Sequence, residues 1–292
     1  MSDQLATPLA GAVAGFARVL VQLSDEELGR EQAGLPGEGL WQGYHDTARE
    51  LTFQVYQDLC EFATAAKTVR AADGAPMTAA CRILARHQAV YRDLHGVLAG
   101  VRDDELDRPP HEGEWPLRNV IGHMMHVEWW GFQPQIRHTI ERRRAGETEP
   151  ASLSREEVQA RWGEVDDRGD LAALLARYDE WHGRVLREFA SLSDEELDAP
   201  TLWWEGYPVP ARFRLHRFDA HLREHTIQAE KTLAWLDHAP SEAERLARLL
   251  YGALGEAEGA IIGAPDTLAD RGRELAASIM ARGEALATGS QA

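Results

Sequence analysis

The sequence predicts an all-α protein, and three observations lead to this prediction. Long stretches of the chain lack both proline and glycine, and Ala211–Ala239 is the clearest of them. A serine is followed three residues later by a glutamate, the spacing of a helix capping box, at Ser24 with Glu27 and again at Ser241 with Glu244. Runs of Val, Ile, Thr and aromatic residues between turn signals are absent from the sequence, so we place no strand.

The composition is that of an ordinary soluble globular protein. The chain has 292 residues, of which 44% are hydrophobic and 27% are charged, and its net charge is −17. This acidic balance argues against a nucleic-acid partner, because binding to phosphates relies on clustered Lys and Arg. No apolar run approaches the roughly 20 residues that cross a bilayer, and Met1–Thr7 lacks the layout of a signal peptide. We expect a cytoplasmic protein without membrane partners.

The N-terminal part of the chain is predicted to form a helical hairpin. Leu9–Leu23 is apolar and rich in small residues, and a short helical turn is expected to start at Ser24. The Gly- and Pro-rich loop Gly34–Gly39 leads to a long helix that extends from Trp41 to about Ala65.

The central part is predicted to contain two long helices and a polar linker. The first helix is Ala79–Leu98, and the second extends from Trp115 to about Arg144. Pro134 should kink or end the first part of that second helix. A short helix is expected from Ser154 in the linker.

Four further helices are predicted in the C-terminal half. They are Asp170–Phe189, the helix within Ala211–Ala239, one that opens at Ser241, and Asp266–Leu286. We expect Gly289–Ala292 to be disordered.

A unit of helix, acidic turn, Trp-bearing loop and helix occurs three times. The acidic turns are Leu23–Leu28, Val101–Leu106 and Leu192–Leu197. Their uneven spacing excludes a solenoid, and antiparallel helical pairs packed into a bundle fit better. We divide the chain into an N-terminal hairpin packed on the bundle (residues 1–70), a metal-binding four-helix bundle (79–238), and C-terminal helices with a tail (239–292).

Two histidines on the helix within Ala211–Ala239 are spaced for metal binding. His221 and His225 stand four residues apart, so their imidazoles point from one face of the helix. Gln228, three residues further, lies on nearly the same side. Such a pair alone is a weak signal, because it needs a third ligand from elsewhere.

The helix that starts at Trp115 offers that ligand. His123 and His126 stand three residues apart, and both could face inward. Three imidazoles suit Zn²⁺, Ni²⁺ or Fe²⁺ and leave positions open for water or substrate. We favour His123 as the ligand and give His126 the role of hydrogen-bonding partner outside the coordination sphere. The remaining internal histidines are interpreted as core or capping residues: His45, His87, His95, His182 and His238.

These stretches resemble the DinB/YfiT-like superfamily. Gly113–His123, G-E-W-P-L-R-N-V-I-G-H, looks like the helix that gives the superfamily its first metal histidine, with Glu128 five residues on. His221–Gln228, H-L-R-E-H-T-I-Q, looks like the H-x-x-x-H-x-x-Q of its last core helix. The resemblance covers roughly Ala79–Leu236, in line with one ordinary domain.

The resemblance implies a four-helix bundle of up-down-down-up type in which His123, His221 and His225 bind a divalent metal. Zn²⁺ is the first candidate, followed by Ni²⁺, Fe²⁺ or Mn²⁺. Superfamily members of known activity include bacterial thiol S-transferases and isomerases that use low-molecular-weight thiols such as mycothiol or bacillithiol. The N-terminal hairpin and C-terminal helices lie outside the usual domain, and they could cover the site, mediate homodimer contacts or extend the bundle.

The expected function is therefore a metal-dependent transferase or hydrolase acting on a small electrophilic substrate. The metal would activate either water or a thiol cosubstrate. Glu128 is the candidate catalytic base, with a structural carboxylate as an equal alternative. Arg217, Trp130 and Gln228 are assigned to substrate binding, Arg217 for an anionic group and Trp130 as a pocket wall. The alternative from another class is a stress-response protein that binds a metal or small molecule without chemistry, and a third is a plain helical scaffold.

Overall fold

The structure, a computed structural model, describes residues 3–31, 47–75, 77–160, 166–264 and 268–289. These residues divide into two compact units, which we describe separately. The bundle unit consists of Met77–His87 and Arg102–His238, and the terminal unit consists of Met1–Pro76, Gln88–Val101 and Ala239–Ala292. The N-terminal hairpin and the C-terminal helices thus fall within the same unit.

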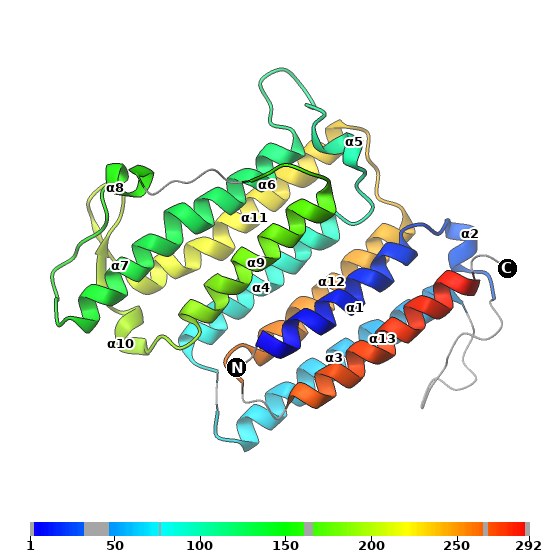
Figure 1. Ribbon diagram of the computed structural model, residues 1–292, viewed down its shortest axis with the longest axis horizontal. Coiled ribbons are helices and arrows are strands. Elements are labelled where there is room, and N and C mark those ends of the chain that lie inside the picture. The colour runs from blue at the N-terminus through cyan, green and yellow to red at the C-terminus, as the bar shows by residue number, and fades with distance from the viewer. Residues whose placement is uncertain (1–2, 32–46, 76, 161–165, 265–267, 290–292) are drawn as a thin grey trace. The chain divides into compact units, whose positions relative to one another are not determined.

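Long helices lying side by side build the bundle unit (Figure 1). They are α4 (Ala79–Val97, of which residues up to His87 are counted in this unit), α6 (Leu117–His126) continued by η2 (Val127–Phe132) and α7 (Gln133–Arg144), α9 (Leu171–Phe189) and α11 (Ala211–Trp235). The connections contain the short helices α5 (Asp103–Leu106), α8 (Arg155–Ala160) and α10 (Asp194–Leu197).

The helices of this unit run up, down, down and up. The thiol of Cys81, near the start of α4, donates to the carbonyl of Ala190 just after α9 (3.4 Å), so α4 and α9 are antiparallel. The backbone N–H of Leu171, at the start of α9, donates to the carboxylate of Asp103 in the turn before α6 (2.9 Å), so α6 and α9 start at the same end. Helix α11 runs back toward that end (Figure 1). The predicted four-helix bundle is confirmed.

The helix that carries His123 changes type just before Pro134. Residues 127–132 form a π turn, η2, and α7 then begins with Pro134 in its first turn. Proline has no N–H to donate, and a π turn is one of the ways in which a helix continues past such a residue. Glu128, Gly131 and Phe132 of this turn are buried.

A short hairpin corrects the expectation that the chain has no strands. β1 (Pro200–Leu202) pairs antiparallel with β2 (Pro208–Pro210), and the turn between them contains Gly206 at φ +86°. Strands of three residues with terminal prolines are too short to show the alternation by which strands are recognised in a sequence. The prolines favour the extended strands because their rings fix φ at a value that extended backbone tolerates.

Arg214 joins this hairpin to α11. Its buried guanidinium donates to the hydroxyl of Thr201 (3.2 Å) and to the carbonyl of Leu202, both in β1. The guanidinium also lies 5.2 Å from the ring centres of both Trp203 and Trp204. The tryptophans of this loop are therefore packed on a buried cation.

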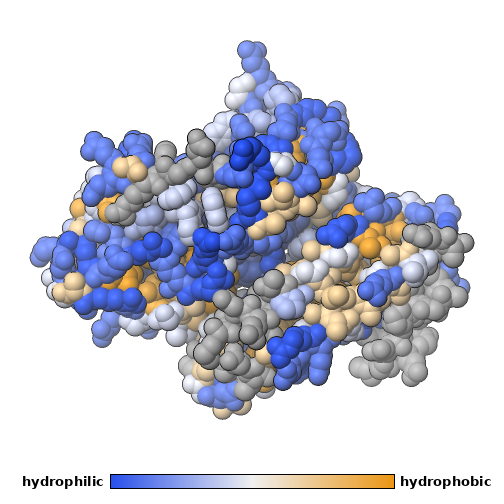
Figure 2. Space-filling view, in the orientation of Figure 1, coloured by the Kyte–Doolittle hydropathy of each residue, from blue (hydrophilic) through white to orange (hydrophobic). Residues whose placement is uncertain are grey.

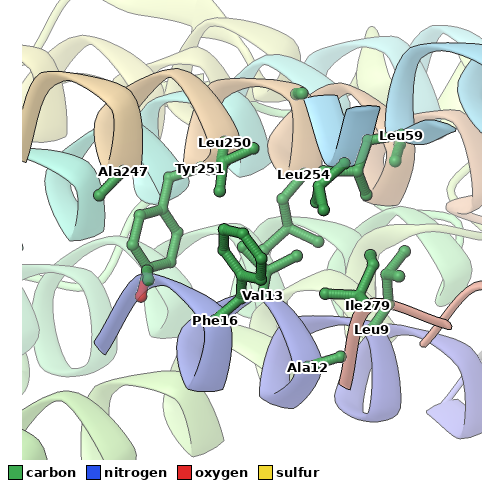
Figure 3. Close-up of a cluster of buried hydrophobic side chains, with 14 of the residues drawn as sticks. Leu9, Ala12, Val13, Phe16, Leu59, Ala247, Leu250, Tyr251, Leu254 and Ile279 are labelled. Carbon is green, nitrogen blue, oxygen red and sulfur yellow. The ribbon is translucent and has the colours of Figure 1, made fainter. Parts of the chain in front are cut away.

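The terminal unit has a hydrophobic core of its own. It contains α1 (Asp3–Leu20), α2 (Asp25–Leu28), α3 (Ala48–Ala72), α12 (Glu242–Ile261) and α13 (Ala269–Gly289). Figure 3 shows Val13 and Phe16 of α1 beside Leu254 of α12 and Ile279 of α13, all of them buried. Apolar residues at helical spacing along each helix supply this core.

Serine caps begin helices where the capping-box spacing predicted them. Ser24 and Ser241 each accept from the backbone N–H three residues later and bind the glutamate there through their own N–H, opening α2 and α12. Ser193 does the same for α10. Ser154 opens α8, as predicted.

Some expectations fall outside the part of the chain that the structure describes. These are the loop Gly34–Gly39, the helix start at Trp41, His45, the helix start at Asp266, and the last residues of the tail.

On the face shown in Figure 2 the surface of the bundle unit is mostly hydrophilic. Within the described ranges, every helix is either too short or too polar for a membrane span.

Candidate functional site

Three histidines meet inside the bundle unit. His221 and His225 lie one turn apart on α11, with ring centres 4.4 Å apart. His123 reaches them from α6, whose Val120 and Met124 are buried in the core and thereby fix the direction of the histidine face. Each imidazole offers one nitrogen, and the three nitrogens lie within 4.8 Å of one another. The structure thus brings together the predicted ligand set.

The contacts between these rings determine which nitrogens face the common point. The Nε2 atoms of His123 and His221 are 3.3 Å apart. Nδ1 of His225 is 2.7 Å from Oε1 of Gln228. An amide oxygen can only accept, so Nδ1 of His225 carries the proton and its Nε2 keeps a free lone pair. Gln228 is therefore placed as the group that sets the tautomer of His225.

The environment favours the neutral form of two of these histidines, His221 and His123. Burial, together with the nearby His225, His123 and Arg217, lowers the pKa of His221 to about 3. Burial also lowers the pKa of His123, as do His225 and His126, while Glu224 opposes the shift. A neutral imidazole is the form that binds a metal ion, so the lowered pKa values of His221 and His123 are compatible with metal binding.

Aromatic rings flank the three histidines. The Trp115 ring centre is 5.1 Å from that of His123, and this tryptophan is 41% exposed. Phe132, from the π turn, meets His221 edge to face at 5.3 Å. Sequence reasoning assigned the pocket wall to Trp130 instead, and the structure places the Trp130 ring against Trp129, with centres 6.3 Å apart.

Two other predicted residues lie near the site. Arg217 is close enough for its charge to lower the pKa of His221, and its guanidinium lies 6.0 Å from the ring centre of Trp203. Its Nε is buried and, among the described residues, has no hydrogen-bond partner. His126 lowers the pKa of His123, and burial lowers its own pKa.

Glu128 belongs to a different cluster. It comes from the π turn and lies with His87 of α4 and His182 of α9, each offering one ligand atom within 4.8 Å of the others. All three are buried, and the hydroxyl of Tyr178 donates to Oε1 of Glu128 at 2.9 Å. Burial raises the pKa of Glu128 to about 8, although the Tyr178 hydrogen bond opposes this.

The sequence alone indicates core or capping roles for His87 and His182. Their ring centres are 4.4 Å apart, so each is part of a polar cluster rather than isolated. No spacing in the sequence could have paired them, because they come from helices far apart in the chain. The partial signal was Glu128, a carboxylate in an otherwise apolar and aromatic stretch.

Comparison with known proteins gives one family and one structure. The sequence profile of the DinB superfamily matches residues 86–229, which contain all the residues of both clusters. No curated protein matches the chain. Among solved structures, YfiT from Bacillus subtilis, described as a probable metal-dependent hydrolase with an unusual four-helix bundle topology, is 19% identical with a TM-score of 0.43. The match covers 54% of this chain and 87% of that one.

Proposed function

We propose, from the premise that residues 86–229 are a DinB superfamily domain, that this protein is a metal-dependent enzyme. The observation that carries the proposal is the convergence of His123, His221 and His225 on one point. Two imidazole nitrogens bound to one tetrahedral Zn²⁺ at the usual bond length lie about 3.4 Å apart. The Nε2 atoms of His123 and His221 are 3.3 Å apart, so the residues present fit such an ion.

The donor set favours a borderline divalent cation. Three neutral nitrogen ligands suit Zn²⁺ first, and Ni²⁺, Fe²⁺ or Mn²⁺ as alternatives. Three protein ligands leave coordination positions open, which distinguishes a catalytic site from a closed structural one. A cation held in this way supplies a nucleophile near neutral pH, because it lowers the pKa of a coordinated water or thiol.

The chain's own residues prepare the site. Gln228 holds the proton on Nδ1 of His225 and keeps the ring in one orientation. Phe132 packs against His221 and limits the movement of that ring, and Trp115 lies beside His123 at the partly exposed side. Arg217 provides a positive charge close to His221, suited to a carboxylate or phosphate.

We infer that the substrate is a small electrophile carrying an anionic group, and that the nucleophile is water or a low-molecular-weight thiol. Glu128 is not assigned to proton transfer here, because it faces His87 and His182. Of the residues near the three histidines, we assign the role of proton acceptor to His126, whose pKa is lowered by burial.

Metal analysis and turnover test this proposal together. The chelated and reloaded His221→Ala protein should lose one metal equivalent, and Gln228→Leu should bind that ion about 10-fold more weakly. His216→Ala is the matched control, because His216 lies on the same helix, 44% exposed, and pairs with Asp219.

Activity is then measured on a panel of electrophiles with and without added thiol. Turnover that needs metal, is lost in His221→Ala and persists in His216→Ala supports the enzyme. Unchanged metal content in His221→Ala would overturn the ligand assignment. Bound metal without turnover would favour a binding protein instead.

A further inference from the structure

The cluster of His87, Glu128 and His182 has the composition of a second metal site. Its residues come from α4, η2 and α9, and all three lie in the bundle unit. Each offers one ligand atom, two ring nitrogens and one carboxylate oxygen, within 4.8 Å of the others. Two imidazoles and a carboxylate are a ligand set that binds first-row divalent transition metals.

His87 lacks the partners that a buried imidazole requires. It is completely buried, and neither of its ring nitrogens has a hydrogen-bond partner among the described residues. The closest polar group is Oε2 of Glu128, 3.8 Å from Nε2 of His87. This separation is too long for a hydrogen bond but suits two atoms that bind the same ion. Nε2 of His87, a buried nitrogen without a hydrogen-bond partner among the described residues, therefore faces the carboxyl group of Glu128.

A simple buried ion pair does not account for this arrangement. Burial lowers the pKa of His87 to about 3 and raises the pKa of Glu128 to about 8. Oε2 of Glu128 lies 3.8 Å from Nε2 of His87, so the two groups do not form a hydrogen-bonded pair. A cation between them would give His87 its missing partner.

The π turn supplies an independent indication. Turns of this type are uncommon and occur frequently at functional sites, because the extra residue redirects a side chain. Here the turn carries Glu128 at a buried position, and Tyr178 holds one oxygen of its carboxyl group, leaving the other toward His87.

We propose that His87, Glu128 and His182 bind a second divalent transition-metal ion in the interior of the bundle unit, with Tyr178 orienting the carboxylate. The ring of Phe218 contacts His87, and it also contacts Phe132, which in turn contacts His221. Two phenyl rings thus link this site to the three-histidine site. Because its ligands are buried, the ion exchanges more slowly than one at the partly exposed site.

Stoichiometry with Co²⁺ as the probe tests the proposal on the full chain. After removal of metal by chelation under mild denaturation and refolding with Co²⁺, the wild type should bind close to two equivalents. His87→Ala and Glu128→Gln should each bind one, His221→Ala one, and His87→Ala combined with His221→Ala none. Glu128→Gln is nearly isosteric with the protonated carboxyl group, so it separates loss of the ligand from loss of the fold.

His95→Ala is the matched control, since His95 is a second buried histidine on α4 outside the cluster. Its stoichiometry should equal that of the wild type. A single equivalent in the wild type, or no change in folded Glu128→Gln and His87→Ala, would overturn the second site and would mean that water or empty space occupies the cluster. Because the His221→Ala result is read separately, this failure leaves the three-histidine site untouched.

Discussion

Glu128 stands five positions after His123, and the two side chains belong to different clusters. On a regular helix this spacing turns side chains well away from each other. His123 faces α11, where His221 and His225 lie, whereas Glu128 faces α4 and α9. One helix therefore contributes both to a partly buried set of three histidines and to a fully buried set of two histidines and a carboxyl group.

The stability of the metal-free protein should depend on Glu128 and pH. The pKa of this carboxyl is about 8 in the folded protein, above its ordinary value of 4.5, so its contribution to folding is complete below about pH 4.5 and is lost as pH rises through 8. Between pH 5.5 and 8.5, wild type should lose roughly 2–4 kcal/mol of unfolding free energy relative to Glu128→Gln. Urea denaturation of chelated protein at both pH values measures this difference.

Glu156→Gln serves as the control for that comparison, because Glu156 is exposed on α8. It should track the wild type at both pH values. A difference between wild type and Glu128→Gln that stays constant with pH would show that the carboxyl group is already ionised in the folded state.

The sequence indicates which histidines lie together better than it indicates their surroundings. Spacing placed His221 and His225 on one face, and the histidines of the helix that starts at Trp115 added His123, which the structure brings to the same point. The neighbours depend on how helices rotate against one another. Spacing along one helix therefore suggests Trp130 as the aromatic wall of the pocket. Helix packing instead puts the ring of Trp115 beside His123, and the ring of Trp130 against Trp129.

At the scale of elements, α11 positions both the histidines and the hairpin that precedes it. Arg214 holds β1 seven residues before His221, and burial lowers the pKa of this guanidinium to about 10. Isolated two-stranded hairpins are marginal in water, so this one depends on contacts such as those with Arg214 and with Ala151, whose carbonyl accepts from the hydroxyl of Thr201 (2.9 Å).

Arg214→Leu should release the hairpin. The substitution removes the hydrogen bonds to Thr201 and Leu202 and lowers the unfolding free energy by about 2–3 kcal/mol, because the buried acceptors lose this donor. Tryptophan fluorescence should report the change, because Trp203 and Trp204 stack on the guanidinium. Amide hydrogen exchange in residues 200–210 should accelerate.

Arg212→Leu provides the comparison, since Arg212 pairs with Asp198 at a more exposed position. We expect its effect to stay within about 1 kcal/mol. Equal effects of the two substitutions would contradict an anchoring role for Arg214.

Helix starts were predictable because a cap is local. The serine and glutamate of each capping box lie within one turn, so their spacing is visible in the sequence. The hairpin and the π turn were not predictable in this way. Both depend on contacts with residues on other elements, and neither produces a repeating pattern of its own.

At the scale of the molecule, the terminal unit gathers three stretches that are distant in the sequence. Its core combines α1 and α3 with α12 and α13, and Gln88–Val101 also belongs to it. Periodicity marks each helix as amphipathic but does not say which apolar faces meet. The division into an N-terminal hairpin and separate C-terminal helices therefore could not anticipate that both share one core.

A buried ion pair connects two of these stretches. The guanidinium of Arg92 donates to both carboxylate oxygens of Glu258 in α12, at 2.7 and 3.0 Å, and Gln88 donates to the same carboxylate. Glu258→Gln should lower the unfolding free energy by about 3 kcal/mol, because it removes the carboxylate charge that pairs with the buried guanidinium of Arg92. Chemical denaturation measures the loss, and hydrogen exchange should place it in α12 and residues 88–97.

Glu256→Gln is the matched control on the same helix. Its partner is Lys67, and both side chains are more than half exposed, so the change should cost less than about 1 kcal/mol. A loss as large as that of Glu258→Gln would show that burial does not distinguish the two pairs.

Because of the π turn, the number of residues in this helix, as well as their types, determines which side chains meet in the interior of the bundle unit. A π turn holds one more residue than an α turn of the same rise. Deleting Gly131 would restore α-helical winding, so the flanking helices would keep nearly the same phase while the side chains within the turn would change direction. Glu128 and Phe132 could then not both keep their present neighbours. Related chains that differ here by a single insertion or deletion would thus be expected to differ in what their interior can hold, even where every histidine is the same.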